Sequence, residues 1–311
     1  MEISVRLKER FCKDCAVPIK IFQEPYFMDR MRLYNKFYGT LKKWDVFTTE
    51  LEKYKCEQDY LEEYNRIKDA AINDIKTTEA YQRFNNEDMN KFAVNNKDIS
   101  GKDIFHPSNN GRKFVSIDMK KANFSSLKYY DVSIFDNAKT WEDFIGKYTE
   151  NKHIINSKYI RQVILGNCNP KRHITYEKHL MDTLLTIIEK FIASQEKFTG
   201  NKLVFFSNDE IAYDVTDMEE NISKEFAKEI ASYITVGLLV PFEVEYFTLK
   251  KINGTNGYYK EFDNGNIEFK CLDNYILPFV MRKFLKQEAV ESDKVFYHNG
   301  LLAKFVETPE I

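Results

Sequence analysis

Residues 203–213 read LVFFSNDEIAY and carry the clearest hairpin pattern of the chain. Two runs of β-branched and aromatic residues, 203–206 and 211–213, flank the polar segment 207–209. Such runs favour strands, and a short polar segment between them favours a tight turn. The sequence therefore predicts a β-hairpin that carries the carboxylate of Asp209 at its tip.

Another strand is predicted upstream, where FVSID (114–118) follows an Asn-Asn-Gly turn and ends in a carboxylate. Between this strand and the hairpin, apolar residues recur at helical spacing over residues 158–198. The hairpin is followed by a helical pattern and then by strand patterns separated by turns, at 217–236, 244–252, 258–262 and 267–270. This order predicts an α+β domain with helices on one face of an antiparallel sheet.

The chain before the turn at 109–111 has a different pattern. Residues from about 46 to 84 are predicted to be helical, with one apolar stripe made of Leu61, Tyr64, Ile67, Ala71 and Ile75. We therefore divide the chain into a mainly helical N-terminal region (1–110), an α+β domain (111–285) and a C-terminal segment (286–311).

The composition excludes several classes of protein. Because 43% of the 311 residues are hydrophobic and 15% are aromatic, the chain can bury a full core and is not disordered. The net charge of −2 provides no overall basic field, so an anionic partner must be held by local patches. We expect no membrane partner and a cytoplasmic location, since no apolar run could cross a bilayer and the N-terminus lacks a signal core. Abundant Lys, Asn and Ile suggest an A+T-rich coding genome, as in many phages and some parasites; for a phage-encoded chain the location would be the host cytoplasm.

Asp118 and Asp209 are the candidate catalytic residues. Asp118 ends a predicted strand, and Asp209 lies at the tip of a predicted hairpin that could lie beside it. Two strand-borne carboxylates on neighbouring strands can hold two Mg²⁺ or Mn²⁺ ions about 4 Å apart. Such ions activate a 3′-hydroxyl and neutralise charge on a transferred phosphoryl group. Taken singly, each aspartate has an ordinary explanation, because Asp is common at strand ends and turns. Glu210 is a weaker candidate ligand, since alternation along a strand points adjacent side chains apart.

Several segments together resemble the motifs of family B DNA polymerases, most closely those of the protein-primed branch. Asp118-Met-Lys-Lys-Ala-Asn123 resembles motif A, in which an Asp at a strand end leads through a turn into a helix. Residues 158–166 resemble motif B, and residues 205–211 resemble motif C. Residues 249–251 resemble the lysine-bearing segment that follows motif C in this family. In the protein-primed branch a strand comes after that segment, and residues 267–271 of this chain resemble it.

The resemblance covers roughly residues 111–285 and implies a polymerase palm. It implies that Asp118 and Asp209 are metal ligands and that Lys158 contacts the triphosphate of the incoming nucleotide. Arg161 lies three residues further on, on the same helix face, and would reach the same phosphates.

Lys250 and Lys251 would hold the backbone of the primer or template, although each also has the simple explanation of a solvated surface charge. Only a short insertion, about 128–165, is available for the fingers, and few residues after 285 remain for a thumb. A partner protein or the N-terminal region would then be needed for processivity on the primer–template.

The departures from the family pattern carry their own predictions. Ser207 stands where the family has the first Asp of motif C, and Gln162, Val163 and Leu165 replace the Asn, Ser and Tyr of motif B. Asn123 stands where these palms usually place an aromatic ring against the 2′ position of the sugar. Because an amide forms hydrogen bonds with a 2′-hydroxyl, we expect ribonucleotides to be accepted, as in a primase.

Two other functions stay open on the sequence. One is a reverse transcriptase-like or template-independent nucleotidyltransferase, for which residues 118–124 would form motif A. The other is a catalytically degenerate palm kept as a nucleic-acid-binding subunit, which Ser207 and the altered motif B favour, since a fold does not guarantee its usual activity.

Overall fold

The computed structural model describes residues 3–94, 99, 104–298 and 300–311. An antiparallel sheet of six strands, in the order β2-β3-β1-β4-β5-β6, forms the centre of residues 111–285. The strands are β1 (Lys113–Met119), β2 (Lys202–Phe206), β3 (Glu210–Asp214), β4 (Phe242–Lys251), β5 (Tyr258–Phe262) and β6 (Ile267–Lys270). The predicted α+β class and the antiparallel sheet are confirmed.

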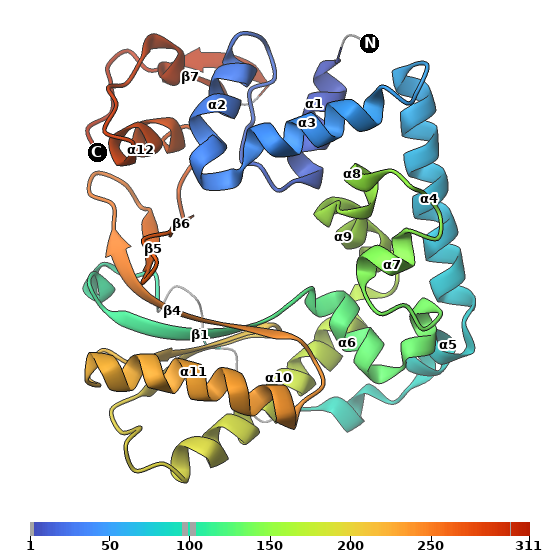
Figure 1. Cartoon of the computed structure of the whole chain (residues 1–311), viewed down its shortest axis with the longest axis vertical. Helices are drawn as coiled ribbons and strands as arrows, with labels where there is room; N and C mark the ends of the chain where they lie inside the picture. The colour runs from blue at the N-terminus through green and yellow to red at the C-terminus, as the bar shows by residue number, and fades with distance from the viewer. Residues whose placement is uncertain (1–2, 95–98, 100–103, 299) are drawn as a thin grey trace.

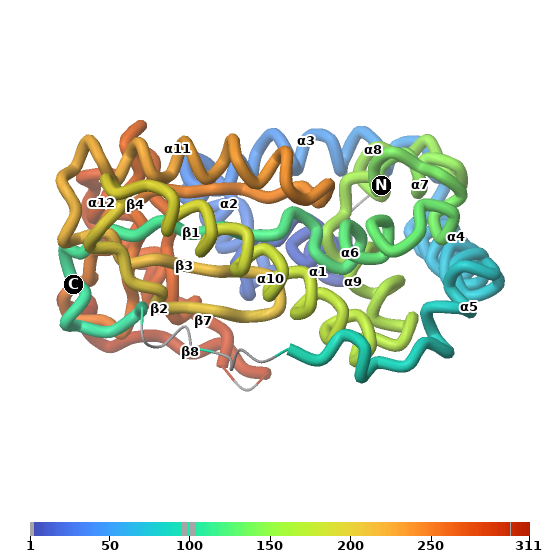
Figure 2. The backbone as a smooth tube through the Cα atoms, turned by 90° about the horizontal axis from the view of Figure 1, so that it is seen from below, coloured from blue at the N-terminus to red at the C-terminus, as the bar shows by residue number. Residues whose placement is uncertain are grey.

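β1 lies in the middle of the sheet, between β3 and β4. Only one face of this strand is covered by the described helices. Val115 and its partner Tyr213 face the helices α10 (Pro170–Ala193) and α11 (Glu220–Gly237), and the Tyr213 ring lies 5.9 Å from that of Phe226 in α11. Figure 2 shows both helices on the near side of the sheet. Since side chains alternate along a strand, Asp118 belongs to the face opposite these helices.

The chain leaves β1 through Lys121, whose φ of 51° lies in the left-handed region, and enters α6 (Ala122–Tyr130). A strand, a short turn and a helix therefore follow one another, as predicted for this segment. Residues 128–165, the predicted fingers, contain the end of α6, the 3₁₀ helix η4 (Val132–Phe135), α7 (Trp141–Ile145), α8 (Lys152–Ile155) and most of α9 (Lys158–Gly166).

Helices dominate the N-terminal region. They are α1 (Val5–Asp14), α2 (Tyr26–Tyr38), α3 (Thr40–Leu51), α4 (Glu57–Thr77) and α5 (Glu79–Asn86), with the 3₁₀ helices η1 (Met89–Phe92) and η3 (Pro107–Asn109). The whole predicted apolar stripe of α4 is buried. The prediction of one helix over residues 46–84 is wrong. The first helix ends at Leu51, and Thr78 caps the start of another. The stretch 158–198 is broken in the same way where Pro170, at a helix start, opens α10.

The chain is completed by α12 (Leu277–Phe284), the 3₁₀ helix η5 (Glu291–Lys294) and a hairpin of β7 (Val295–His298) and β8 (Leu301–Lys304). In Figure 1 the elements form a four-sided frame. The sheet with α10 and α11 makes the lower side, and α1 to α3 make the upper side. The helices α4 to α9 make the right side, and the C-terminal elements with β5 and β6 make the left.

One buried ion pair joins the upper and left sides of this frame. The guanidinium of Arg30 in α2 lies 2.7 Å from the carboxylate of Asp293 in η5. No helix in the described part of the chain combines the length and the apolar character needed to cross a bilayer.

Candidate active site

Asp118 and Asp209 meet where the tip of the β2–β3 hairpin lies against the end of β1. The backbone N–H of Met119 donates a hydrogen bond of 2.7 Å to the carbonyl of Asp209. Burial, followed by the charges of Glu210 and Asp209, raises the pKa of Asp118 to about 6. The two aspartates paired in the sequence analysis are therefore close enough to influence each other's charge.

Glu210 is a third carboxylate at this place. It begins β3 and lies directly opposite Asp118 in the strand register, so both side chains project from the same face. Burial raises the pKa of Glu210, although the positive charge of Lys260 opposes this effect. Alternation predicts that Glu210 and Asp209 point apart; in the structure Asp209 belongs to the turn, and the strand that pairs Glu210 with Asp118 begins only at Glu210.

Ser207 shapes the turn that presents these carboxylates. Its hydroxyl oxygen accepts hydrogen bonds from the backbone N–H groups of Asp209 and Glu210, at 3.3 and 3.1 Å. The same hydroxyl donates to the Asp209 carboxylate at 3.0 Å. Ser207 therefore orients the carboxylate of Asp209.

Glu177, which no sequence pattern singled out, holds the turn from α10. It lies on α10, is 4% exposed, and accepts a hydrogen bond of 2.8 Å from the side-chain amide of Asn208. Burial raises the pKa of Glu177 to about 7. The signal that could have found it is its position in the helical series formed with Leu180 and Leu184, where an acidic residue interrupts an apolar stripe.

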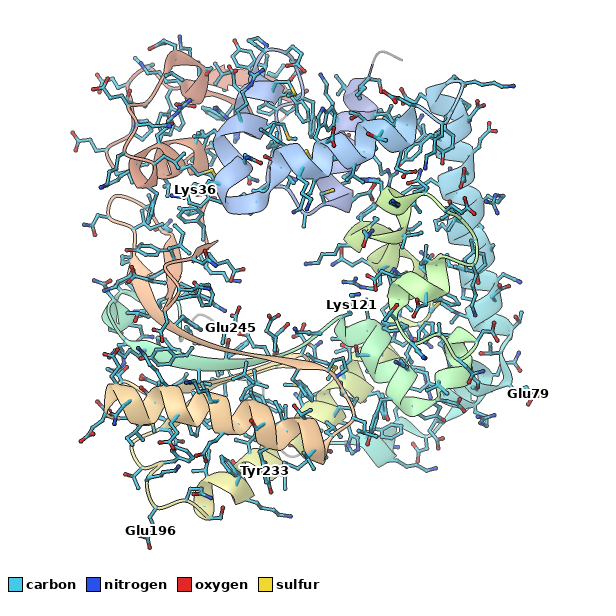
Figure 3. The ribbon with its side chains drawn as sticks, viewed as in Figure 1. Lys36, Glu79, Lys121, Glu196, Tyr233 and Glu245 are labelled. Carbon is cyan, nitrogen blue, oxygen red and sulfur yellow. The ribbon has the colours of Figure 1, made fainter. Side chains whose placement is uncertain are left out.

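Lys260 of β5, also missed, adds a positive charge to the site. Its ammonium lies 2.9 Å from the carboxylate of Glu245 and 4.5 Å from the centre of the Phe247 ring, and the residue is 5% exposed. The charge of Lys260 lowers the pKa of Asp118, against the stronger effect of burial. Figure 3 shows Glu245 on the inner border of the frame, together with Lys121 at the start of α6.

Lys158 and Arg161 lie on α9, which packs against α1, α4 and α6. Lys158 is exposed, whereas Arg161 is half-buried, and burial lowers its pKa despite the nearby charge of Glu142. Among the described residues, no hydrogen bond or ion pair joins either side chain to the carboxylates at the end of β1. In Figure 1, α9 stands above α6 and borders the centre of the frame on the right.

Asn123 is the second residue of α6, close in sequence to the end of β1. Its side chain is half-buried, and its amide makes no hydrogen bond with any other described residue. An unpaired amide at this position is available to a ligand.

Lys250 and Lys251 lie at the opposite end of β4 from the carboxylates. Glu243 of β4 pairs with Asp118, and Lys250 lies seven residues further along the strand, which is roughly 23 Å away. The Lys251 ammonium donates to the carbonyls of Thr255 and Gly257, in the turn after β4. The sheet therefore does not bring these two lysines together with the aspartates.

No protein-family model matches this chain, and no curated protein matches it.

The carboxylates suit a hard divalent cation. Among the described residues, no three His, Cys, Asp or Glu side chains form a group that could hold a metal ion alone. Mg²⁺ in nucleotide sites, however, is usually held by one or two protein carboxylates together with phosphate and water oxygens. Asp118 and Asp209 fit that requirement, because a cation between them would offset the negative charges of Glu210 and Asp209, which after burial raise the pKa of Asp118.

Proposed function

We propose that this chain is a nucleotidyltransferase that extends a nucleic-acid strand on a polymerase-palm-like sheet. The observation that carries the proposal is the convergence of Asp118, Asp209 and Glu210 at one end of the central strands. The local order agrees with it, since β1 leads through a turn into α6 and a hairpin lies beside β1. This is the arrangement that the resemblance to polymerase motifs A and C implies.

In this proposal Asp118 and Asp209 hold Mg²⁺ or Mn²⁺. Such ions, when bound, supply the charge that activates a 3′-hydroxyl and stabilises a transferred phosphoryl group. The chain's own residues position this chemistry. Ser207 and the Glu177–Asn208 hydrogen bond fix the turn, and Lys260 balances part of the negative charge.

The substrates would be nucleoside triphosphates and a primer–template. Lys158 and Arg161 would contact the triphosphate from α9, and Lys250 and Lys251 would contact the nucleic-acid backbone outside the site. The short fingers segment 128–165 favours low processivity unless a partner protein supplies it, and binding should weaken steeply with salt. The unpaired amide of Asn123 supports acceptance of ribonucleotides.

The deciding experiment is metal-dependent incorporation of labelled nucleotides on DNA and RNA primer–templates and without template. Asp118→Asn and Asp209→Asn should each reduce incorporation by at least about a thousandfold, as expected when a charged group at the reacting centre is removed. Asp69→Asn, on the exposed face of α4, is the matched control and should retain full activity. Equal activity in all four proteins would contradict the proposal.

The same assay separates the alternatives. Incorporation without template, or strong preference for an RNA template, would favour the template-independent or reverse transcriptase-like enzyme. A nucleic-acid-binding subunit is favoured by Lys260, because a buried ammonium beside the carboxylates already balances part of the charge that a metal would balance. That function predicts nucleic-acid binding without incorporation in the wild-type protein.

Sugar selection is tested by comparing ribonucleotides with deoxyribonucleotides in the wild type and in Asn123→Tyr. We expect the wild type to use both and the variant, whose ring would occupy the space near a 2′-hydroxyl, to lose ribonucleotide incorporation selectively. The same strong deoxyribonucleotide preference in both proteins would contradict a role for Asn123.

A further inference from the structure

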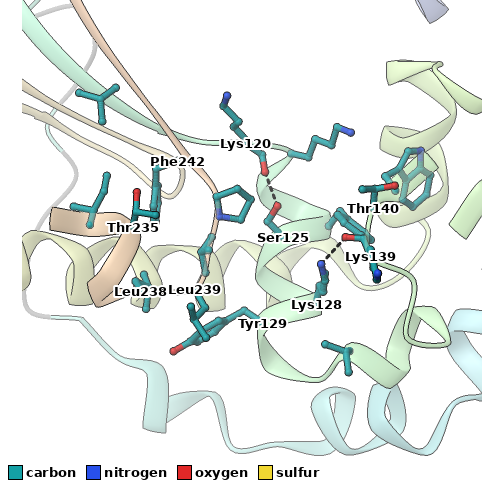
Figure 4. A pocket seen from close by; sticks show the side chains of 18 of the residues that line it. Lys120, Ser125, Lys128, Tyr129, Lys139, Thr140, Thr235, Leu238, Leu239 and Phe242 are labelled. Carbon is teal, nitrogen blue, oxygen red and sulfur yellow. Dashed lines mark hydrogen bonds between the residues drawn. The ribbon is translucent and has the colours of Figure 1, made fainter. Parts of the chain in front are cut away.

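A groove of about 940 Å³ lies between α6 and the end of α11, on the side of β1 that faces the helices. Figure 4 shows Leu238, Leu239 and Phe242 on one wall and Lys128, Lys139 and Thr140 on the other. We name it the α6–α11 groove. It does not contain the carboxylates of the candidate active site, so the following inference stands apart from the proposed function.

The groove is bordered by apolar side chains that solvent reaches. Leu239 is 85% exposed and lines the groove, and the adjoining Val236 is 86% exposed. Tyr129 and Val132, which line it from the α6 side, are also exposed. A contiguous exposed apolar patch around a concave surface is typical of a site where another molecule binds.

The charge of the groove has one sign. Four lysines, Lys120, Lys121, Lys128 and Lys139, line it, and no Asp or Glu is among its described lining residues. The chain as a whole has slightly more acidic than basic residues, so this distribution departs from its average. Lys120 and Lys121 pair with Glu243 and Glu142 outside the lining. The Lys128 ammonium donates to the carbonyl of Lys139, and neither Lys128 nor Lys139 has an ion-pair partner in the described part of the chain.

We infer that the α6–α11 groove binds an amphipathic helix of a partner protein, with acidic residues beside its apolar face. The aliphatic floor, which includes Ile234, Leu238 and Val240, matches the apolar side chains of such a helix. Lys128 and Lys139 on the rim, which have no ion-pair partner in the described part of the chain, match its carboxylates and would steer its approach. A nucleic-acid strand fits less well, because its bases need exposed aromatic platforms and Tyr129 is the one exposed ring among the described lining residues.

The test is selection from a displayed library of peptides of about 18 residues, long enough to form a helix. Apolar residues are fixed at helical spacing, and the other positions vary among Glu, Lys, Ser and Gln. We expect the peptides selected on the wild-type protein to be enriched in Glu over Lys. A synthetic peptide from the pool should then bind at least about tenfold more weakly to Leu239→Glu and to Lys139→Glu.

Two control variants match these changes elsewhere on the surface. Val306→Glu changes another almost fully exposed apolar residue, and Lys190→Glu reverses an exposed lysine on α10. Neither should alter peptide binding. Because the Leu239 and Lys139 side chains are exposed, circular dichroism melts of their variants should match the wild type, which excludes unfolding as the cause.

Three results would overturn the inference. The selected pool could contain as much Lys as Glu, or its peptides could bind Leu239→Glu as well as the wild type. A labelled single-stranded oligonucleotide could bind through Lys139 while the peptides do not, which would make the groove a nucleic-acid surface. Sedimentation could show a wild-type dimer that Leu239→Glu dissociates, which would make the occupant a second copy of this chain.

Discussion

Asp118 lies where burial and two neighbouring carboxylates disfavour its ionised form, with a pKa of about 6 against an ordinary value of 3.8. The folded protein therefore binds this proton more tightly than the unfolded chain does, so the residue lowers stability as the pH rises from about 4 to about 6. We predict that Asp118→Asn unfolds at a higher temperature than the wild type at pH 8 without divalent ions. The gain should be about 1–2 kcal/mol after allowance for partial exposure.

Two further measurements connect this gain with metal binding. The difference should be small at pH 4, where the wild-type carboxyl is largely protonated. If Asp118 holds Mg²⁺ as proposed, the difference should also shrink at pH 8 when Mg²⁺ is added, because an ion bound there would stabilise the wild-type protein. Asp69→Asn should show neither effect. A wild-type protein that is more stable than Asp118→Asn at pH 8 without metal would contradict the argument.

The charge of Glu177 should also lower stability at high pH, although this residue holds the turn and is not a proposed metal ligand. Its pKa of about 7, raised from 4.5 by burial, means that its charge lowers stability as the pH rises through this range. Glu177→Gln keeps an acceptor for the Asn208 amide and removes the charge, so it should be about 2 kcal/mol more stable than the wild type at pH 8 and nearly equal at pH 4.

Glu177→Leu removes the acceptor and leaves the Asn208 amide without its partner. If Glu177 positions the turn, this variant should lose activity while the Gln variant retains it. The control is Glu189→Gln, an exposed residue of the same helix. Urea denaturation at the two pH values gives the stabilities, and equal activity of both Glu177 variants would exclude the positioning role.

At the scale of elements, local patterns predicted the strands better than the helices. β5 and β6 have the predicted bounds, because turn residues on either side of a short aromatic and β-branched run define a strand locally. The breaks after Leu51 and before Pro170 were missed, since apolar periodicity continues across them. Lys260 could not be assigned to the site, because its proximity to Asp118 depends on β4 lying between their strands, which no local pattern encodes.

The N-terminus of α9 is anchored to the N-terminal region through Ser157 and Asp14. Ser157 caps this helix by accepting from the N–H of Ile160, and its hydroxyl donates at 2.7 Å to the buried Asp14 of α1. Tyr64 and His153 also contact the Asp14 carboxylate, so the N-terminal region holds the end of α9 that carries Lys158. Ser157→Ala should cost about 1–3 kcal/mol, through the lost cap and the weakened network.

Thr140→Ala is the matched control, since it removes the cap of α7 at an exposed position without touching Asp14. It should cost about 1 kcal/mol. If Lys158 contacts the triphosphate, Ser157→Ala should also raise KM for nucleotide with little change in kcat, whereas Thr140→Ala should leave KM unchanged. A lower kcat with unchanged KM in Ser157→Ala would contradict that contact.

For the whole molecule, the contact between α2 and η5 closes the frame. It joins Arg30 and Asp293, which are 263 positions apart in the sequence. Arg30 donates to the Asp293 carboxylate and to the carbonyls of Ser292, Asp293 and Val295, and both side chains of the pair are at most 4% exposed. Arg282 reaches the other carboxylate oxygen of Asp293 at 2.9 Å. The N-terminal and C-terminal parts of the chain are therefore held together by one desolvated charge network.

Removing both members of a buried ion pair costs less than the sum of removing each alone, because each single substitution leaves a buried charge without its partner. We predict that Arg30→Met costs about 3 kcal/mol, since Arg282 still pairs with Asp293. Arg30→Met combined with Asp293→Leu should cost at least about 1 kcal/mol less than the sum of the two single changes. Arg282 is partly exposed and can turn to solvent in the double variant.

Urea denaturation of the four proteins gives this coupling energy directly, and limited proteolysis supplies a second readout. If the pair closes the frame, the segment after residue 286 should be cleaved sooner in Arg30→Met than in the wild type, because its docking on α2 is the contact that is lost. Additive costs within about 0.5 kcal/mol, with unchanged cleavage, would mean that the apolar packing of α12 on α2 holds the two parts together without the ion pair.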